Sequence, residues 1–197
     1  ASMTQAKIIA LSGPRACGKS TIAGHLVSQH GYTRIAFADA LRELASVAGN
    51  EFANDRIYLA QLGEKLRVLM PDFLLKVVQN KVNSLEGPVV IEDLRYPSEV
   101  KFCRNLGATT IRLEISEEVQ LLRIEEREGK VGEEATNLLA CLDESLLDGT
   151  QWDFVIDAIG DFKELAFKLD SFILTEKVGP VDESQLPSDV TPQEVKA

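Results

Sequence analysis

The sequence predicts an α/β protein built as a three-layer sandwich, in which helices cover both faces of a five-stranded parallel sheet. Two observations support this fold class. Short apolar segments alternate along the chain with longer helical patterns, and strands that are connected through helices lie parallel, with right-handed crossovers. The segments 7–11 and 89–91 are apolar at successive positions, which is typical of strands buried on both faces.

The remaining elements follow from periodicity and turn signals. Gly31 suits the position after the first helix, Pro71 separates two helices, and Ser116 suits an N-cap. Strands are expected at 7–11, 33–37, 89–93, 109–115 and 154–156. Helices are expected at 21–29, 38–49, 56–70, 72–85, 96–106, 117–129, 135–147 and 161–174.

Length and composition indicate one ordinary globular domain. The chain has 197 residues, of which 45% are hydrophobic and 26% charged, and this is enough for a single core. No apolar run approaches the roughly 20 residues of a membrane span, and the N-terminus lacks a signal-peptide pattern. The net charge of −10 argues against a general nucleic-acid binder, which needs a basic face. The three cysteines lack metal-ligand spacing, so we expect a reducing cytoplasm.

The segment 13–21, GPRACGKST, fits the phosphate-loop pattern G-x-x-x-x-G-K-[ST] between a buried strand and a helix. In such a loop, successive backbone N–H groups and the positive helix start bind phosphate oxygens. Lys19 supplies a charge for the β- and γ-phosphates, and Ser20 supplies a hydroxyl for Mg²⁺. The pattern therefore predicts a site for a nucleoside triphosphate with Mg²⁺, and we expect this nucleotide to be ATP. The expected ATP-binding residues are Gly13, Arg15, Ala16, Cys17, Gly18, Lys19, Ser20 and Thr21.

Two carboxylates at the end of the strand 89–93 are candidates for the metal site. Asp93 ends an apolar strand, as the acidic partner of a phosphate loop does when it holds Mg²⁺. Glu92 competes for this role, and alternation along the strand places the two side chains on opposite faces. We expect Asp93, together with Ser20, to hold the metal.

Arginines recur near predicted helix starts, strand ends and turns. Arginine binds phosphate through a planar, bidentate contact. A kinase whose acceptor is a neutral hydroxyl needs few arginines, whereas several around one cleft favour an acceptor that itself carries a phosphate. Ligands of parallel sheets lie outside the carboxyl ends of the strands, where several of these side chains are expected. The polar candidates are Asp39, Arg42, Arg67, Arg95, Arg123 and Arg127.

Several segments carry a family resemblance. The phosphate loop, FADALR at 37–42 and IEDLRYPSE at 91–99 resemble the phage and bacterial deoxynucleoside monophosphate kinases of the P-loop kinase superfamily. The resemblance spans about residues 7–174. Further similar segments are 62–67, 71–73, 143–148 and 153–157, with Phe73, Asp143 and Ala158 as departures from the usual residues.

The resemblance implies a single domain of P-loop kinase architecture over residues 3–175. Its helical acceptor-binding region would lie at about 39–86. Its lid, at about 128–150, would close over the transferring phosphoryl group. The remaining residues, 176–197, are acidic and poor in apolar side chains, and we expect them to form a flexible tail.

The resemblance also implies two groups of site residues. Arg123 and Arg127 lie four residues apart on one helix face and look like lid arginines, although pairing with glutamates of the same helix is the alternative. The group that binds the acceptor monophosphate is Asp39, Arg42, Arg67 and Arg95. The catalytic group is Lys19, Arg123 and Arg127.

We therefore expect a kinase that transfers the γ-phosphoryl group of ATP to a deoxynucleoside monophosphate. The expected partners are these two small molecules, and we expect no nucleic acid and no membrane. The sequence is compatible with a homodimer. Dephospho-coenzyme A kinase and other small-metabolite kinases are alternatives among enzymes. Outside enzymes, the alternative is a regulatory module that binds ATP without transferring a phosphoryl group.

Overall fold

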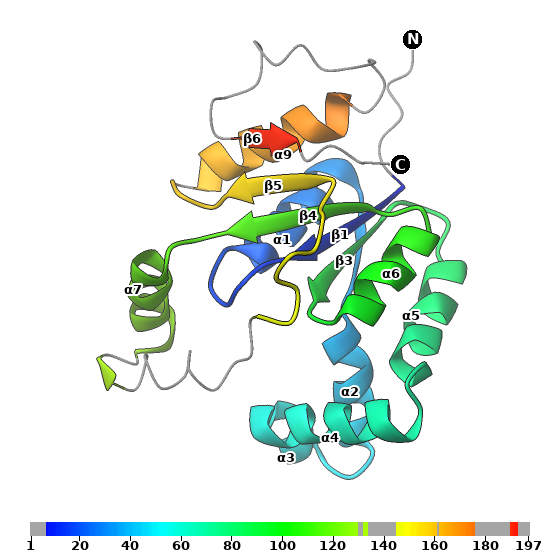
Figure 1. Ribbon diagram of the computed structural model, residues 1–197. Helices are drawn as coiled ribbons and strands as arrows, with labels where there is room; N and C mark the ends of the chain where they lie inside the picture. The colour runs from blue at the N-terminus through cyan, green and yellow to red at the C-terminus, as the bar shows by residue number, and fades with distance from the viewer. Residues whose placement is uncertain (1–6, 130–131, 134–144, 161, 176–189, 193–197) are drawn as a thin grey trace.

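The computed structural model describes residues 7–129, 132–133, 145–160, 162–175 and 190–192. Its parallel strands are the five that the sequence predicts: β1 (Ile8–Ser12), β2 (Thr33–Ile35), β3 (Val89–Leu94), β4 (Thr109–Glu114) and β5 (Phe154–Asp157). They are ordered β2-β3-β1-β4-β5, so β1 lies between β3 and β4 (Figure 1). The phosphate loop, which follows β1, therefore opens at the middle of the sheet.

A sixth strand, β6 (Val190–Pro192), pairs antiparallel with β5 at the edge of the sheet. It falls within 176–197, where the sequence predicts a flexible tail and no strand. The physical reason is that one side of β5 offers N–H and C=O groups that another segment can pair with. The flexibility expected of the tail at 176–197 stays a prediction.

Two helical layers enclose the sheet (Figure 1). Side chains alternate along β1, so Ile9 and Leu11 face one layer while Ile8 and Ala10 face the other. The first layer consists of α1 (Lys19–His30) and α9 (Phe162–Thr175). The second consists of α2 (Phe37–Ser46), α5 (Phe73–Asn83) and α6 (Pro97–Asn105). These layers confirm the predicted three-layer sandwich.

Three more helices extend away from the sheet. They are α3 (Asn50–Asn54), α4 (Arg56–Leu69) and α7 (Glu117–Glu128). The sequence does not predict α3, because the pair Gly49 and Asn50 reads as the end of a helix. Asp55 caps α4, accepting from the backbone amides of Ile57 at 3.0 Å and Tyr58 at 3.1 Å. The helix expected at 135–147 lies largely outside the described residues.

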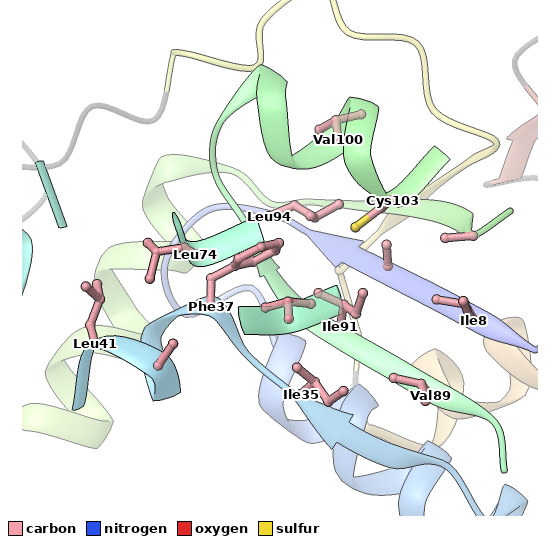
Figure 2. Close-up of a cluster of buried hydrophobic side chains, with 14 of the residues drawn as sticks. Ile8, Ile35, Phe37, Leu41, Leu74, Val89, Ile91, Leu94, Val100 and Cys103 are labelled. Carbon is pink, nitrogen blue, oxygen red and sulfur yellow. The ribbon is translucent and has the colours of Figure 1, made fainter. Parts of the chain in front are cut away.

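Figure 2 shows the hydrophobic core between the sheet and the second layer. Phe37, at the start of α2, packs in one cluster with Ile91 and Leu94 of β3 and with Val100 and Cys103 of α6. Phe37 is 2% exposed, and burial of such a side chain contributes roughly 1.5–3 kcal/mol. This packing fixes the start of α2 directly beyond β2, at the edge where the phosphate loop lies. Within the described ranges, no helix is both long and apolar enough to cross a membrane.

Candidate active site

The phosphate loop connects β1 to α1, as the sequence predicts. It turns through Ala16 and Gly18, whose φ angles are 61° and 100°. The left-handed conformation directly before α1 suits glycine, which has no Cβ. At Gly13 the limit is space, because a Cβ there would lie 2.6 Å from Cys17 Sγ and 2.8 Å from the Leu113 carbonyl oxygen. The loop therefore curls tightly in front of the helix N-terminus, an arrangement suited to an anion.

Lys19 folds back over this loop. Its ammonium group donates hydrogen bonds to the carbonyl oxygens of Gly13 and Pro14, the latter at 3.0 Å, and lies 3.7 Å from Cys17 Sγ. The loop thus holds a positive charge close to its own backbone, where the phosphates of a nucleotide are expected. Cys17 is fully buried, so its small side chain fills the interior of the loop.

Ser20 lies in the first turn of α1, facing the end of β3. Its hydroxyl donates a 2.6 Å hydrogen bond to Glu92 Oε1. The other carboxylate oxygen of Glu92 accepts a hydrogen bond from Arg34 of β2. The sequence predicts Asp93 beside the loop serine, whereas the structure places Glu92 there. The Glu92 side chain is 8% exposed, so its charge is held at the base of the loop and neutralised by one guanidinium group.

Asp93 has a different set of contacts. Its two carboxylate oxygens accept hydrogen bonds from the backbone N–H groups of Phe37 at 2.8 Å and Ala38 at 2.9 Å. These are the first amides of α2, which have no partner within the helix. Burial raises the pKa of Asp93, while the two amides and the charge of Arg95 oppose this. Asp93 thus anchors the start of α2.

Asp39 and Arg42 lie in the first turns of α2. Asp39 accepts hydrogen bonds from Arg42 Nη1 at 2.9 Å and from Arg34 Nη1 at 3.4 Å. Arg34 therefore bridges Glu92 and Asp39, and a continuous chain of polar contacts leads from Ser20 to Arg42. Half of the Arg42 side chain is exposed, which leaves its guanidinium accessible to a ligand.

Arg67 of α4 reaches across to the loop that follows β3. Its guanidinium group stacks on the Tyr96 ring, 3.8 Å from the centroid, and lies 3.9 Å from Glu99 Oε2. The other carboxylate oxygen of Glu99 accepts hydrogen bonds from the backbone N–H groups of Arg95 and Tyr96, both at 3.0 Å. Burial, reinforced by the charge of Asp93, raises the pKa of Glu99 to about 7. One buried carboxyl group thus holds the loop of Arg95 and faces the side chain of Arg67.

Arg123 of α7 contacts the opposite side of the phosphate loop. It donates hydrogen bonds to the carbonyl oxygens of Ala16 at 3.2 Å and Ala158 at 2.9 Å. This joins α7 to the loop and to the segment that follows β5. Arg127 lies one turn further along α7 and is exposed. Residues 130–131 and 134–144 of the expected lid lie outside the described residues.

The sequence did not predict two residues of this site, Arg34 and Glu99. Arg34 is the one charged residue of the predicted strand 33–37, and a charge within this mostly apolar segment is the signal that could have identified it. Glu99 is the third residue of a helix that begins at Pro97, the position from which a glutamate reaches back to free amides. Of the remaining expected loop residues, Arg15 is half-buried and Thr21 is exposed in the first turn of α1.

Comparisons with known proteins agree with this architecture. A family model described as AAA domain matches residues 9–139. The solved structure of TT1252 from Thermus thermophilus is 23% identical, with a TM-score of 0.61, and the match covers 89% of this chain and 100% of that one. A shikimate kinase from Bacteroides thetaiotaomicron is 17% identical, with a TM-score of 0.55 and coverage of 84% and 96%.

A gluconokinase from Sinorhizobium meliloti 1021 is 18% identical, with a TM-score of 0.52, and the match covers 83% of this chain and 90% of that one. No curated protein matches the chain. At these identities the structural likeness shows the fold, which is the α/β fold of P-loop kinases.

Proposed function

The chain belongs to the AAA domain family, and on that premise we propose that it is a kinase that transfers the γ-phosphoryl group of ATP to a deoxynucleoside monophosphate. The phosphate loop supports the donor side of this proposal. The observation that carries the acceptor side is that four arginines from separate elements surround the carboxylates Asp39, Asp93 and Glu99. The arginines are Arg34 of β2, Arg42 of α2, Arg67 of α4 and Arg95 after β3.

The residues around Ser20 fit a magnesium ion. Mg²⁺ prefers hard oxygen ligands, and the Ser20 hydroxyl and the Glu92 carboxylate are both oxygen donors that already lie 2.6 Å apart. We assign these two residues, in place of the Ser20 and Asp93 pair expected from the sequence, as those that would hold it. When bound with ATP, the ion supplies charge neutralisation at the β- and γ-phosphates.

On the donor side, Lys19 and the loop amides neutralise the phosphates. The Lys19 ammonium group already lies within the loop, held by the Gly13 and Pro14 carbonyl oxygens. Its long side chain can exchange these carbonyls for phosphate oxygens without a change in the backbone. Arg123 would support the transferring group from the other side of the loop, together with Arg127.

On the acceptor side, guanidinium groups bind the phosphate of the monophosphate. Arg42 is accessible, and Arg67 is oriented by its stacking on Tyr96, so it loses little side-chain freedom when it binds an anion. The Asp39 carboxylate accepts from both Arg34 and Arg42 and so keeps these two cations at fixed positions. This pairing suits a positioning residue better than a general base.

The reaction itself needs no strong base. An oxygen of the acceptor phosphate is already anionic, so the chain has to align it with the γ-phosphoryl group and offset the repulsion between the two anions. Arginines on the acceptor side and Lys19 on the donor side supply this positive charge. Closure of the region 128–150 would exclude water and suppress hydrolysis of ATP.

The test is a coupled assay of ADP release with Mg²⁺ and ATP. The acceptor panel contains deoxynucleoside and ribonucleoside monophosphates and dephospho-coenzyme A. It also contains gluconate and shikimate, because two of the similar structures are a gluconokinase and a shikimate kinase. We expect a deoxynucleoside monophosphate to stimulate ADP release most, and Lys19→Met to abolish that stimulation. If only an acceptor with a hydroxyl group, such as gluconate or shikimate, stimulates ADP release, the assignment of a monophosphate acceptor is wrong. With no stimulation by any acceptor, the ATP-binding regulatory module would be the better reading.

A further inference from the structure

A second cluster of polar side chains lies in a groove between α1 and α9, on the face of the sheet opposite α2, α5 and α6. His25 and His30 come from α1, and Asp170 comes from α9. The groove beside them is lined by Gly24, Ser28, Lys163, Ala166 and Phe167. Thr21, at the end of the phosphate loop, also lines this groove, whereas the two histidines and Asp170 have no part in the proposed phosphoryl transfer.

Both imidazole rings point at one atom. His25 Nε2 and His30 Nε2 each lie 2.8 Å from the same carboxylate oxygen, Oδ1 of Asp170. The rings are arranged edge to face, with their centroids 5.5 Å apart and an interplanar angle of 70°. Two imidazole nitrogens and one carboxylate oxygen therefore lie close together in a small volume.

This convergence is not a simple consequence of helix periodicity. Residues five apart on an α-helix project roughly 140° from one another, so His25 and His30 do not share a face of α1 by spacing alone. His30 is the last residue of α1, where the chain leaves the helix at Gly31. The sequence contains two histidines in all, and both lie on this one carboxylate.

We propose that His25, His30 and Asp170 bind a divalent transition-metal ion of the Zn²⁺ type, with water completing the coordination. Imidazole nitrogen and carboxylate oxygen are ligands that zinc prefers. The three ligand atoms all lie within 4.8 Å of one another. Ligands of a tetrahedral zinc ion are about 3.3 Å apart, so each 2.8 Å N–O contact has to widen by only a few tenths of an ångström.

The surroundings of the three side chains are compatible with such a site. The exposed fractions are 11% for His25, 18% for His30 and 35% for Asp170, so the ligands are partly shielded while an ion and a water molecule can enter.

The ion would cross-link the two helices of the first layer. Because α1 begins at Lys19 and α9 follows β5, the site ties the helix of the phosphate loop to a helix from the C-terminal part of the described chain. A ligand that binds only the folded state raises the stability by an amount that grows with the logarithm of the ligand concentration once the site is saturated. This proposal is independent of the proposed kinase activity.

The test is a titration of the full, tag-free chain with Co²⁺ in the absence of nucleotide, followed by visible absorption and by competition with Zn²⁺. We expect one ion per chain, displaced by one Zn²⁺. His25→Gln, His30→Gln and Asp170→Asn should each weaken binding at least about 10-fold, because each removes a ligand. Three controls should bind as the wild type does: Asp148→Asn and Glu86→Gln at exposed carboxylates, and Cys141→Ser at a thiol outside the described residues.

A second measurement separates loss of metal binding from loss of folding. Zn²⁺ should raise the melting temperature of the wild type and of the three controls, and leave the three ligand variants unchanged. The melting temperature without metal shows that each variant is folded. If Zn²⁺ does not shift the wild type, or if it shifts the ligand variants equally, the three side chains form a hydrogen-bonded cluster and the metal site is refuted.

Discussion

The hydroxyl of Ser20 donates a 2.6 Å hydrogen bond to the carboxylate of Glu92 and so joins the first turn of α1 to the end of β3. The next residue, Asp93, binds the first amides of α2. Two adjacent carboxylates thus have separate tasks, because successive side chains of a strand point to opposite faces. One faces the phosphate loop, and the other anchors the helix that carries Asp39 and Arg42.

Glu92→Gln should lower the magnesium-dependent turnover by roughly 100-fold, since it removes an anionic oxygen from the proposed metal position. The melting temperature should change little, because Arg34 is 42% exposed and can be solvated once its partner is neutral. The measurement is the rate of ADP release as a function of Mg²⁺ concentration, with thermal unfolding alongside. A turnover equal to that of the wild type at every Mg²⁺ concentration would remove Glu92 from the metal site.

Asp93→Asn should instead lower stability by about 1–3 kcal/mol, because an amide offers one acceptor oxygen where the carboxylate offers two. The NH₂ group would also face a backbone N–H of α2. The free energy of unfolding, measured in urea, tests this. Should Asp93→Asn keep full stability and lose its dependence on Mg²⁺, the roles of Glu92 and Asp93 would be the reverse of those we assign.

Arg42→Ala and Arg95→Ala should weaken the use of the acceptor much more than the binding of ATP. Both arginines lie beyond Ser20, on elements that follow β2 and β3, and neither contacts the phosphate loop among the described residues. The comparison is KM for the monophosphate against the dissociation constant of ATP. Arg104→Ala, at an exposed residue of α6, is the matched control and should leave both constants unchanged. If either variant weakens ATP binding as much as it weakens use of the monophosphate, the division into ATP-binding and acceptor-binding residues is wrong.

Gly63→Ala should impair acceptor use without unfolding the protein. A Cβ at this position would lie 2.9 Å from Arg67 Nη1 and 3.0 Å from Leu41 Cδ1, so the Arg67 guanidinium group has to shift from its present position on Tyr96. Alanine favours a helix by up to about 1 kcal/mol over glycine, which offsets the crowding. We expect a higher KM for the monophosphate at nearly unchanged stability.

Gly24→Ala is the matched control for this change, because no atom lies within 4 Å of the added Cβ. It should raise stability slightly and leave KM unaltered. If both glycine variants leave KM unaltered, the stacked position of Arg67 has no part in acceptor binding.

Glu99 should make stability depend on pH. Its pKa rises from an ordinary value of 4.5 to about 7 because of burial and the nearby Asp93. Between these two values the unfolded chain releases the proton while the folded chain keeps it, so stability falls as pH rises through this window. Glu99→Gln keeps an oxygen for the amides of Arg95 and Tyr96 and removes the titrating group.

The variant should therefore gain stability relative to the wild type at pH 8 and show no such gain at pH 4. Urea unfolding across this range measures the difference. Glu86→Gln, at an exposed position, is the control and should follow the wild type throughout. If the free energy of unfolding of Glu99→Gln differs from that of the wild type by the same amount at pH 4 and at pH 8, the pKa of Glu99 is not raised.

The sequence by itself determined the parts that depend on local pattern. A buried strand, a tight loop and a helix start are neighbours along the chain, so residues 8–30 predict the phosphate loop and its Lys19 and Ser20. Apolar runs between helices likewise predict five parallel strands. Each of these signals lies within about ten residues, the range over which periodicity and turn chemistry act.

Tertiary structure decided which distant side chains meet. Because side chains alternate along a strand, the sequence predicts that Glu92 and Asp93 point to opposite faces of the sheet. Which of the two faces Ser20 depends on how β3 packs beside β1 and beneath α2. Arg34 becomes part of the site because β2 pairs with β3, and β6 forms because β5 would otherwise be an open edge. His25 and His30 meet Asp170, 145 and 140 residues further along the chain, through the packing of two helices on one face of the sheet. Contacts of this kind arise from the fold as a whole, which no local pattern encodes.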